Sequence, residues 1–296
     1  ICLTSMSNEK KCFFKEPGLK FVNIILHALS ETFMLFGDIF EKKGLIFELV
    51  KRDYHSRHMV SALGFVWNIA QPLVMMLIMW FVFVFGLKAS RTAEEVPFIL
   101  YFFSAQIAWN FFSESWSSST GVILEYSFLV KKINFRLSIL PIVKIMSALI
   151  NHAVLIVFLI VVLFINGYYP DIFWLQFIYY LFCTVSLVLG LSWITSAMNV
   201  FWRDIGFIIS IGLQFGFWLT PIFWQTKLLP EKFLPFIRLN PAYYIVQGYR
   251  DTFVYHKWFW QVDVFLTIQF WVVTAFFLMI GMIVFRRLRP HFADVI

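Results

Sequence analysis

Charged residues are scarce in this sequence, and that scarcity excludes most soluble folds. Asp, Glu, Lys and Arg make up 14% of the 296 residues, whereas about 25% is usual in soluble domains. The net charge is +7, but the cations are divided among apolar runs instead of being clustered, so we expect no nucleic-acid partner. The composition is that of a protein that resides in a lipid bilayer.

The signatures of several chemistries are missing as well. The three cysteines show no metal-ligand spacing, and His55 and His58 beside Asp53 are more typical of a solvated helix face than of a metal site. The sequence contains neither a nucleophile elbow nor a GxxxxGK phosphate-binding loop followed by Ser or Thr. We therefore expect this chain to hold no metal, no cofactor and no catalytic residue. If ATP drives its activity, ATP and Mg²⁺ are bound by a separate subunit.

Long apolar runs are what the sequence has in abundance, since 60% of its residues are hydrophobic. A helix that spans a membrane needs roughly 20 apolar residues, and six runs approach or exceed that length. They cover residues 59–87, 96–113, 145–170, 172–202, 205–226 and 264–285. We predict an all-α polytopic membrane protein with six transmembrane helices, in which 1–58 is a cytoplasmic and amphipathic region and 59–296 the membrane domain.

The distribution of Lys and Arg predicts how these spans are oriented. If both termini are cytoplasmic, 17 of the 24 Lys and Arg residues fall on the cytoplasmic side of six alternating spans. This asymmetry satisfies the positive-inside rule. We therefore predict a multi-pass protein of the cytoplasmic membrane with both termini inside the cell.

Two amphipathic segments precede the first span. Residues 21–40 gather their polar side chains on one face, and residues 44–58 place Ile46, Val50 and Tyr54 on one line of a helix. Helices of this kind lie in the membrane interface, although a contact surface for a cytoplasmic partner is an alternative. The charged side of the second segment carries Lys51, Arg52, Asp53 and Arg57.

A polar stripe interrupts the second apolar run. Gln106, Asn110 and Glu114 recur at helical spacing. An ionised Glu at the bilayer centre costs about 3 kcal/mol, so Glu114 should face protein or water. The stripe either lines a hydrated path or forms a polar seam between helices.

Isolated polar residues occur in two other runs. Pro72 is expected to kink the first span, and Asn68 and Gln71 lie within one turn of it, where such side chains connect helices. His152 lies in the third run without an acidic neighbour in sequence. It is expected to pack between helices, with a proton relay as the alternative.

A basic segment separates the second and third runs. In "SFLVKKINFRLSILP", residues 127–141, Lys131, Lys132 and Arg136 interrupt an otherwise apolar sequence. Two interpretations are open. The segment docks into a groove of a soluble subunit, or its cations only mark the cytoplasmic side of the membrane.

The sequence after the fifth run differs from the rest. It contains four prolines and two short apolar pieces, residues 232–239 and 242–249, which are too short to span. We predict short re-entrant helices at the outer face. Before the fifth run, "MNVFWRDIG" predicts a tight cytoplasmic turn that contains Arg203 and Asp204.

The order of these features resembles the membrane subunit of type-2 ABC exporters of lipid-linked surface polymers. The resemblance covers roughly residues 44–296 and rests on "VKRDYHSRHMVSALGFVWNIAQPL", "VPFILYFFSAQIAWNFF", "KKINFRLSILP", "VFWRDIGFIIS" and "LNPAYYIVQGYRDTFVYHKWFW". Residues 1–43 have no match. Teichoic acid translocation permeases look most similar, with O-antigen and capsular polysaccharide exporters as relatives.

The resemblance implies roles for individual residues. A cytoplasmic coupling helix would contact the ATPase through Lys131, Lys132, Ile133, Asn134, Phe135 and Arg136, with a smaller contact at Arg203 and Asp204. An interface helix would serve substrate access through Lys51, Arg52, Asp53 and Arg57. The translocation path would involve Trp67, Asn68, Gln71, Gln106, Asn110, Glu114, Phe215 and Trp218. An external gate would contain Phe233, Phe236, Tyr243 and Tyr244.

The resemblance also implies an assembly of two copies of this chain with two nucleotide-binding subunits, surrounded by membrane lipids. The predicted function is ATP-driven export of an undecaprenyl-linked, teichoic-acid-like polymer. O-antigen or capsular polysaccharide export and small-molecule ABC export are alternatives with the same fold. A membrane-embedded transferase or secondary carrier is an alternative of a different class, and it would need no ATPase partner.

Overall fold

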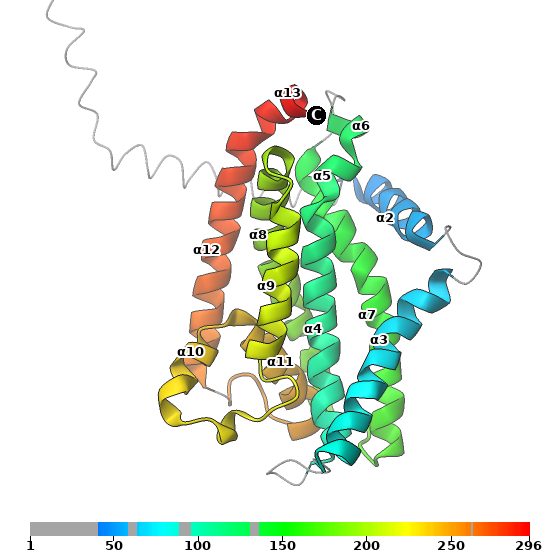
Figure 1. The fold of residues 1–296 in the computed structure, drawn as a ribbon, viewed down its shortest axis with the longest axis vertical. Coiled ribbons are helices and arrows are strands. Elements are labelled where there is room, and N and C mark those ends of the chain that lie inside the picture. Colours follow the sequence, from blue (N-terminus) through cyan, green and yellow to red (C-terminus); the bar gives the residue numbers. More distant parts are fainter. Residues whose placement is uncertain (1–40, 59–63, 89–95, 131–135, 262) are drawn as a thin grey trace, which may run out of the picture. The chain divides into compact units, whose positions relative to one another are not determined.

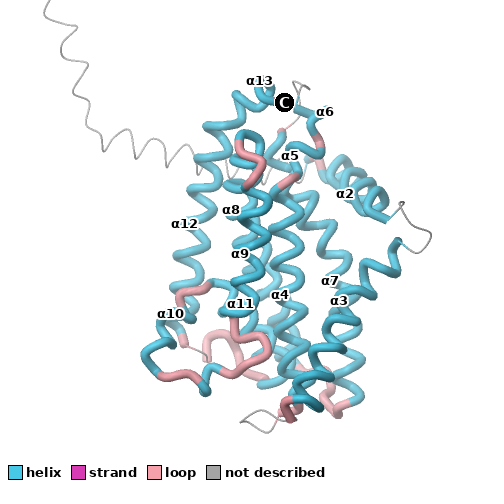
Figure 2. Tube along the Cα trace, viewed as in Figure 1, coloured by secondary structure: helices cyan, strands magenta, loops and turns pink. Residues whose placement is uncertain are grey.

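The computed structural model describes residues 41–58, 64–88, 96–130, 136–261 and 263–296. The regular elements in these ranges are all helices (Figure 1, Figure 2). The chain divides into two compact units, residues 1–43 and 44–296, and nearly all described residues belong to the second. The amphipathic helix predicted at 21–40 lies outside the described residues.

The helices follow the predicted apolar runs. They are α2 (Lys43–His58), α3 (Gly64–Phe81) with the π-helical turn η1 (Val82–Gly86), α4 (Phe98–Thr120), α5 (Val122–Glu125), α6 (Ser127–Val130), α7 (Leu140–Ile165), α8 (Phe177–Phe201), α9 (Ile205–Leu219), α10 (Leu234–Arg238), α11 (Pro241–Arg250), α12 (Val264–Leu288) and α13 (Phe292–Val295). Within the second unit, α2, α5, α6 and α13 lie at one end of the helix bundle, and α10 and α11 lie at the other (Figure 1).

Among the described residues, four helical segments are long and apolar enough to cross a membrane. They cover Ile69–Gly86, Leu137–Ile165, Ile172–Phe201 and Val264–Val295. α4 has 23 residues, but its polar stripe makes it much less apolar than these four. α9 has only 15 residues, because Pro221 follows and disfavours helical backbone in the residue before it. The protein is therefore a multi-pass membrane protein with several apolar helices.

Local sequence explains where several helices begin. Pro141 occupies the first turn of α7. Backbone N–H groups in this turn have no partner within the helix, so the missing N–H of proline costs no hydrogen bond. The side chain of Asn240 accepts a hydrogen bond from the Ala242 amide at the start of α11, and Asp263 accepts one from Phe265 at the start of α12. These side chains satisfy amides that have no partner within the helix.

The core is built around α4, which packs against α7, α8, α9 and α11. Its apolar and aromatic residues are almost all buried, and they include Phe102, Phe103 and Phe111. Burial of large aromatic side chains supplies most of the apolar contact area that holds such a bundle together. α4 is thus an inner helix even though it is the most polar of the long ones.

The pair α8 and α12 is held by close backbone contact. A β-carbon added to Gly190 of α8 would stand 2.7 Å from the Leu278 nitrogen of α12, and one added to Gly281 would overlap the Gly190 carbonyl oxygen. Small residues allow helix backbones to approach closely within a membrane. The two glycines therefore fix how α8 and α12 pack.

In contrast, α3 and α9 bury little of their surface within the described residues. Almost none of residues 69–86 is buried, and α9 buries only Ile205 and Leu213. Large apolar side chains such as Phe81, Phe207 and Phe215 are exposed on these helices. Lipid or another protein must cover them in the membrane.

Candidate functional site: a polar cavity within the helix bundle

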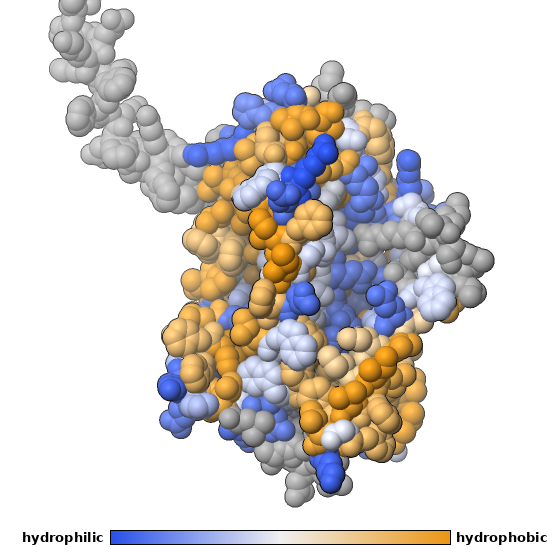
Figure 3. Space-filling model, viewed as in Figure 1, coloured by the Kyte–Doolittle hydropathy of each residue, from blue (hydrophilic) through white to orange (hydrophobic). Residues whose placement is uncertain are grey.

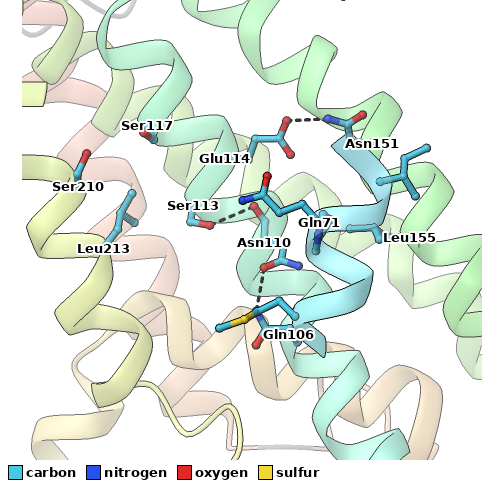
Figure 4. Close-up of a pocket in the computed structure, with 13 residues that line it drawn as sticks. Gln71, Gln106, Asn110, Ser113, Glu114, Ser117, Asn151, Leu155, Ser210 and Leu213 are labelled. Carbon is cyan, nitrogen blue, oxygen red and sulfur yellow. Dashed lines mark hydrogen bonds between the residues drawn. The ribbon is translucent and has the colours of Figure 1, made fainter. Parts of the chain in front are cut away.

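A cavity of about 490 Å³ lies between α3, α4, α7 and α9. Its polar wall consists mainly of Gln71, Gln106, Asn110, Glu114 and Asn151 (Figure 4). Apolar side chains complete the lining. The volume is within the range of about 300–1,000 Å³ that is typical of small-molecule sites. On the same face of the molecule, hydrophilic surface occurs between apolar areas (Figure 3).

Hydrogen bonds fix the polar wall. The Gln106 Nε2 donates to Asn110 Oδ1 at 2.8 Å, one helical turn along α4. The Asn151 Nδ2 of α7 donates to Glu114 Oε1 of α4, also at 2.8 Å (Figure 4). The second bond joins two helices, so Glu114 contributes both to a seam between helices and to the surface of a cavity.

Two oxygen atoms of this wall have no hydrogen-bond partner within the described residues. They are Gln106 Oε1 and Asn151 Oδ1, and their side chains are only 8% and 5% exposed. A buried acceptor without a partner costs about 1–3 kcal/mol. Both atoms are themselves buried, so they lie behind the surface of the cavity and not on it.

A buried ion cluster lies at the α2 end of the bundle. The Lys144 ammonium of α7 lies 2.5 Å from the Asp53 carboxylate of α2 and 2.6 Å from Glu125 of α5. The Tyr126 hydroxyl donates to Asp53 at 3.2 Å. Lys144 is 2% exposed and Asp53 is fully buried. This Lys144 cluster (Asp53, Glu125, Tyr126 and Lys144) ties α2 to the segment that leads into the basic stretch.

A residue of α2 also interacts electrostatically with the cavity wall. Burial raises the pKa of Tyr54, and the negative charge of Glu114 raises that pKa further. Tyr54 follows Asp53 directly in α2, so one of two consecutive residues belongs to the Lys144 cluster and the other is affected by the charge of Glu114.

The comparisons with known proteins identify the family of this chain. The profile of the family described as "ABC-2 type transporter" matches residues 44–254. The chain belongs to the ABC-2 type transporter family. It is also similar to the O-antigen export system permease protein RfbA of Klebsiella pneumoniae, with 26% identity over 258 residues that cover 86% of this chain and 96% of that protein. The O-antigen export system permease protein RfbA of Myxococcus xanthus is 25% identical over 225 residues, which cover 75% of this chain and 85% of that protein.

In this ABC-2 type chain, the structure brings together only part of the predicted path. Gln71, Gln106, Asn110 and Glu114 line one cavity. The side chain of Asn68 lies outside the described part of the structure. Three predicted aromatic residues do not line the cavity but are exposed on α3 and α9: Trp67, Phe215 and Trp218.

The structure describes only some of the residues that were predicted to contact the ATPase. Lys131, Lys132, Ile133, Asn134 and Phe135 lie outside the described residues. Arg136 is half-buried directly before the turn that leads into α7. The turn between α8 and α9 exposes Arg203 and Asp204, and the Trp202 indole donates to the Asp204 carboxylate at 3.0 Å.

The residues predicted for the interface helix divide into two groups. Lys51 and Arg52 are exposed on α2, and the Arg52 guanidinium lies 5.6 Å from the centre of the Phe128 ring of α6. Asp53 is buried in the Lys144 cluster instead of facing solvent. The side chain of Arg57 is not among those described.

The four residues predicted for the gate have different environments. Phe233 and Phe236 are exposed, Tyr243 is half-buried, and Tyr244 is buried. The hydroxyls of Tyr244 and Tyr179 are 2.9 Å apart, which ties α11 to α8. α11 is therefore part of the core, whereas α10 lies on the surface.

The environment of His152 is that of a packing residue. Its ring stacks on Phe111 with centroids 4.5 Å apart, and its Nε2 lies 3.1 Å from the Tyr249 hydroxyl.

The site residues that the sequence analysis missed are Asn151, Lys144 and Glu125. The signal was present for the first two, because Asn151 is a polar residue within the run 145–170 and Lys144 is a charged residue directly before that run.

Proposed function

We propose that this chain is the membrane-spanning subunit of an ATP-driven exporter that moves an undecaprenyl-linked polysaccharide out of the cell. The observation that carries the proposal is the family match over residues 44–254, together with relatives described as O-antigen export permeases that align with most of the chain. The relatives favour an O-antigen-like polysaccharide over the teichoic-acid-like polymer predicted from the sequence.

The proposal includes an architecture. Six spans (α3, α4, α7, α8, α9 and α12) cross the cytoplasmic membrane, and both termini are cytoplasmic. Two copies of the chain form the path, and their exposed α3 and α9 faces face each other or lipid. α10 and α11 form the external gate. The positive-inside distribution of Lys and Arg supports this orientation.

In the proposed mechanism, ATP hydrolysis and transport take place in different subunits. Two nucleotide-binding subunits bind ATP and Mg²⁺, while this chain performs no bond cleavage itself. The basic stretch around Lys131, Lys132 and Arg136 contacts those subunits. Their motion would pass through α6 and the Lys144 cluster to α2. Lys51 and Arg52 would guide the anionic pyrophosphate of the carrier lipid.

The decisive experiment is co-purification with the nucleotide-binding subunit, followed by ATP-dependent export from reconstituted vesicles. Lys131, Lys132 and Arg136 are reversed to Glu, and the matched control reverses Arg286, Arg287 and Arg289. We expect only the first triple variant to lose the nucleotide-binding subunit. Protease mapping of the loops checks that neither variant has inverted its spans, because removing positive charge can do so.

The same experiment separates the alternatives. A secondary carrier or a membrane-embedded transferase would act without a nucleotide-binding subunit and without ATP, which would refute the proposal. Export of a small drug-like molecule but of no lipid-linked glycan would indicate a small-molecule exporter. Export of a capsular polysaccharide instead of an O-antigen would still be ATP-driven polysaccharide export. It would change only the identity of the proposed cargo.

A further inference from the structure

Aromatic rings gather where α8 and α12 begin. They come from two segments: the 3₁₀ turn η3 (Ile172–Gln176) before α8, and residues 256–261, which follow α11 and η6 (Asp251–Tyr255) and lead into α12. The Trp258 ring is parallel to that of Trp260, with centroids 4.7 Å apart, and its centroid lies 4.9 Å from that of Phe173. We call the group formed by these rings and the adjacent Phe259 the aromatic cap (Phe173, Trp258, Phe259 and Trp260).

The backbone of the aromatic cap is hydrogen-bonded within the protein. Gln176 is 4% exposed, and its side chain donates to the Lys257 carbonyl oxygen at 2.7 Å and accepts from the Phe259 amide at 3.1 Å. The Trp258 amide donates to the Gln261 side chain at 3.1 Å, and the Trp258 carbonyl oxygen accepts from the Gln261 amide at 2.9 Å. These four backbone groups need no water. A segment whose backbone is satisfied in this way can leave water at low cost.

The apolar surface continues from the aromatic cap onto both neighbouring helices. Trp260 is 55% exposed, and the candidate spanning segments Ile172–Phe201 and Val264–Val295 begin beside the cap. Large apolar side chains are exposed where these segments start: Ile172, Leu175, Ile178, Val264 and Phe265. The cap therefore lies where the two segments would enter a membrane, and it borders surface that lipid covers.

The chemistry of the aromatic cap fits lipid better than it fits a glycan. Tryptophan is enriched at the membrane–water interface because its ring is apolar while its N–H is polar. Exposed rings also bind sugars, but such sites need free polar groups beside the ring. The amide oxygens of Gln176 and Gln261 are instead bonded to the backbone of the cap. Lys257 is exposed in the same turn, and a lysine at this level can extend its ammonium to lipid phosphates.

We propose that the aromatic cap inserts into the headgroup layer of the bilayer and anchors this end of the chain there. In the proposed orientation, that layer belongs to the outer leaflet. η6 continues directly from α11, and Phe253 of η6 packs against Trp174 of η3 with ring centroids 5.5 Å apart. The anchor therefore also sets the depth of α11. The inference depends neither on ATP nor on the identity of the cargo.

The test maps which layer of the bilayer the aromatic cap contacts. The purified chain is placed in nanodiscs of phosphatidylethanolamine and phosphatidylglycerol that contain a phospholipid with a photoreactive diazirine, either in the headgroup or at the end of an acyl chain. A third sample receives a water-soluble diazirine. Labelled residues are identified by mass spectrometry. Val272, an exposed residue further along α12, is the internal control for the hydrocarbon layer.

Three variants are compared with the wild type. The double variant Trp258→Ser with Trp260→Ser removes the stacked pair of rings, whereas Trp260→Tyr keeps an aromatic ring with a polar group. Phe236→Ser removes an exposed ring of α10 outside the cap, and it is the matched control. Size-exclusion profiles check that each variant is folded. If the double variant does not fold, Trp260→Ser alone takes its place.

In the wild type, we expect the headgroup probe to label residues 257–261 about fivefold more than the chain-end probe does, with the reverse at Val272. The double variant should reduce the headgroup labelling by about threefold and increase the labelling from water. Trp260→Tyr and Phe236→Ser should resemble the wild type. Labelling of the wild-type cap mainly from water or mainly by the chain-end probe would overturn the inference. So would protection of the cap from the water-soluble probe by a soluble glycan, because that result would indicate a sugar-binding surface.

Discussion

The ammonium of Lys144 lies between the carboxylates of Asp53 and Glu125, at 2.5 Å and 2.6 Å. One side chain of α7 thus joins α2 to α5, although Asp53 is 91 residues away in sequence. Burying charged groups is costly, so a cluster of this kind contributes positional specificity more than net stability. In the proposed mechanism, this cluster would transmit motion from the predicted ATPase contact to α2.

Removing the cation of the Lys144 cluster should strongly destabilise the protein. Lys144→Met leaves the carboxylate of Asp53 buried without its cation, and we expect a loss of about 3–5 kcal/mol in stability. The measurement is thermal unfolding of the purified protein in nanodiscs. The double variant Lys144→Met with Asp53→Asn should recover much of the loss, because the introduced amide carries no charge and can still accept from Tyr126. A single variant as stable as the wild type would show that the cluster is not formed.

A second prediction concerns Arg250, a buried arginine of α11. Its Nη2 donates to the carbonyl oxygens of Pro221 and Ile222 at 2.7 Å, and its Nε donates to that of Tyr101 at 3.1 Å. These bonds hold the segment after α9 against α4 and α11. Arg250→Lys keeps the charge but not the planar fork of donors, so we expect a loss of about 3 kcal/mol or more in stability.

The control for Arg250 is a similar substitution at the surface. Arg238 forms an exposed ion pair with Asp263, and Arg238→Lys should change the stability by less than about 1 kcal/mol. Equal melting temperatures for Arg250→Lys and Arg238→Lys would contradict the assigned role of the buried guanidinium.

The glycine contact between α8 and α12 gives a third prediction. Gly190→Ala or Gly281→Ala forces the two backbones apart, and overpacking of this kind typically costs about 1–3 kcal/mol. Gly212→Ala in α9 has no heavy atom within 4 Å of the added methyl group, so it should be neutral or stabilising by up to about 1 kcal/mol. Unfolding temperatures of the three variants measured side by side provide the comparison.

A fourth prediction tests whether His152 carries protons. Its neighbours Phe111, Phe177 and Tyr249 enclose the ring, so we expect a packing role. His152→Gln keeps an acceptor for the Tyr249 hydroxyl, and ATP-driven export should stay within about twofold of the wild type between about pH 6 and 8. A variant whose export no longer responds to pH in the way the wild type does would instead support the proton relay.

The sequence alone predicted the positions of the long helices well, because a membrane helix is encoded by a local apolar run. The segment expected at 44–58 forms a helix over Lys43–His58, and the sixth run forms α12. The fifth run was expected to extend to residue 226, but α9 ends at Leu219 because Pro221 stops it. Six spans remain a prediction, since four segments in the part of the chain that the structure describes meet the length and composition of a spanning helix.

The site was predictable only in part, because its partners are distant in sequence. The spacing of Gln106, Asn110 and Glu114 revealed one face of α4. The partner of Glu114 is Asn151, 37 residues away on another helix, and no local pattern connects the two. Likewise, Asp53 has the sequence context of a solvated charge, and only the packing of α2 on α7 shows that it is buried.

The contact between Gly190 and Gly281 has a consequence for synthesis. Chains insert into the membrane in the order in which they are made, so α8 enters well before α12 has left the ribosome. Until then the backbone around Gly190 lacks its partner in α12, so this close contact forms only late in synthesis. A chain interrupted before residue 264 would lack the contact altogether.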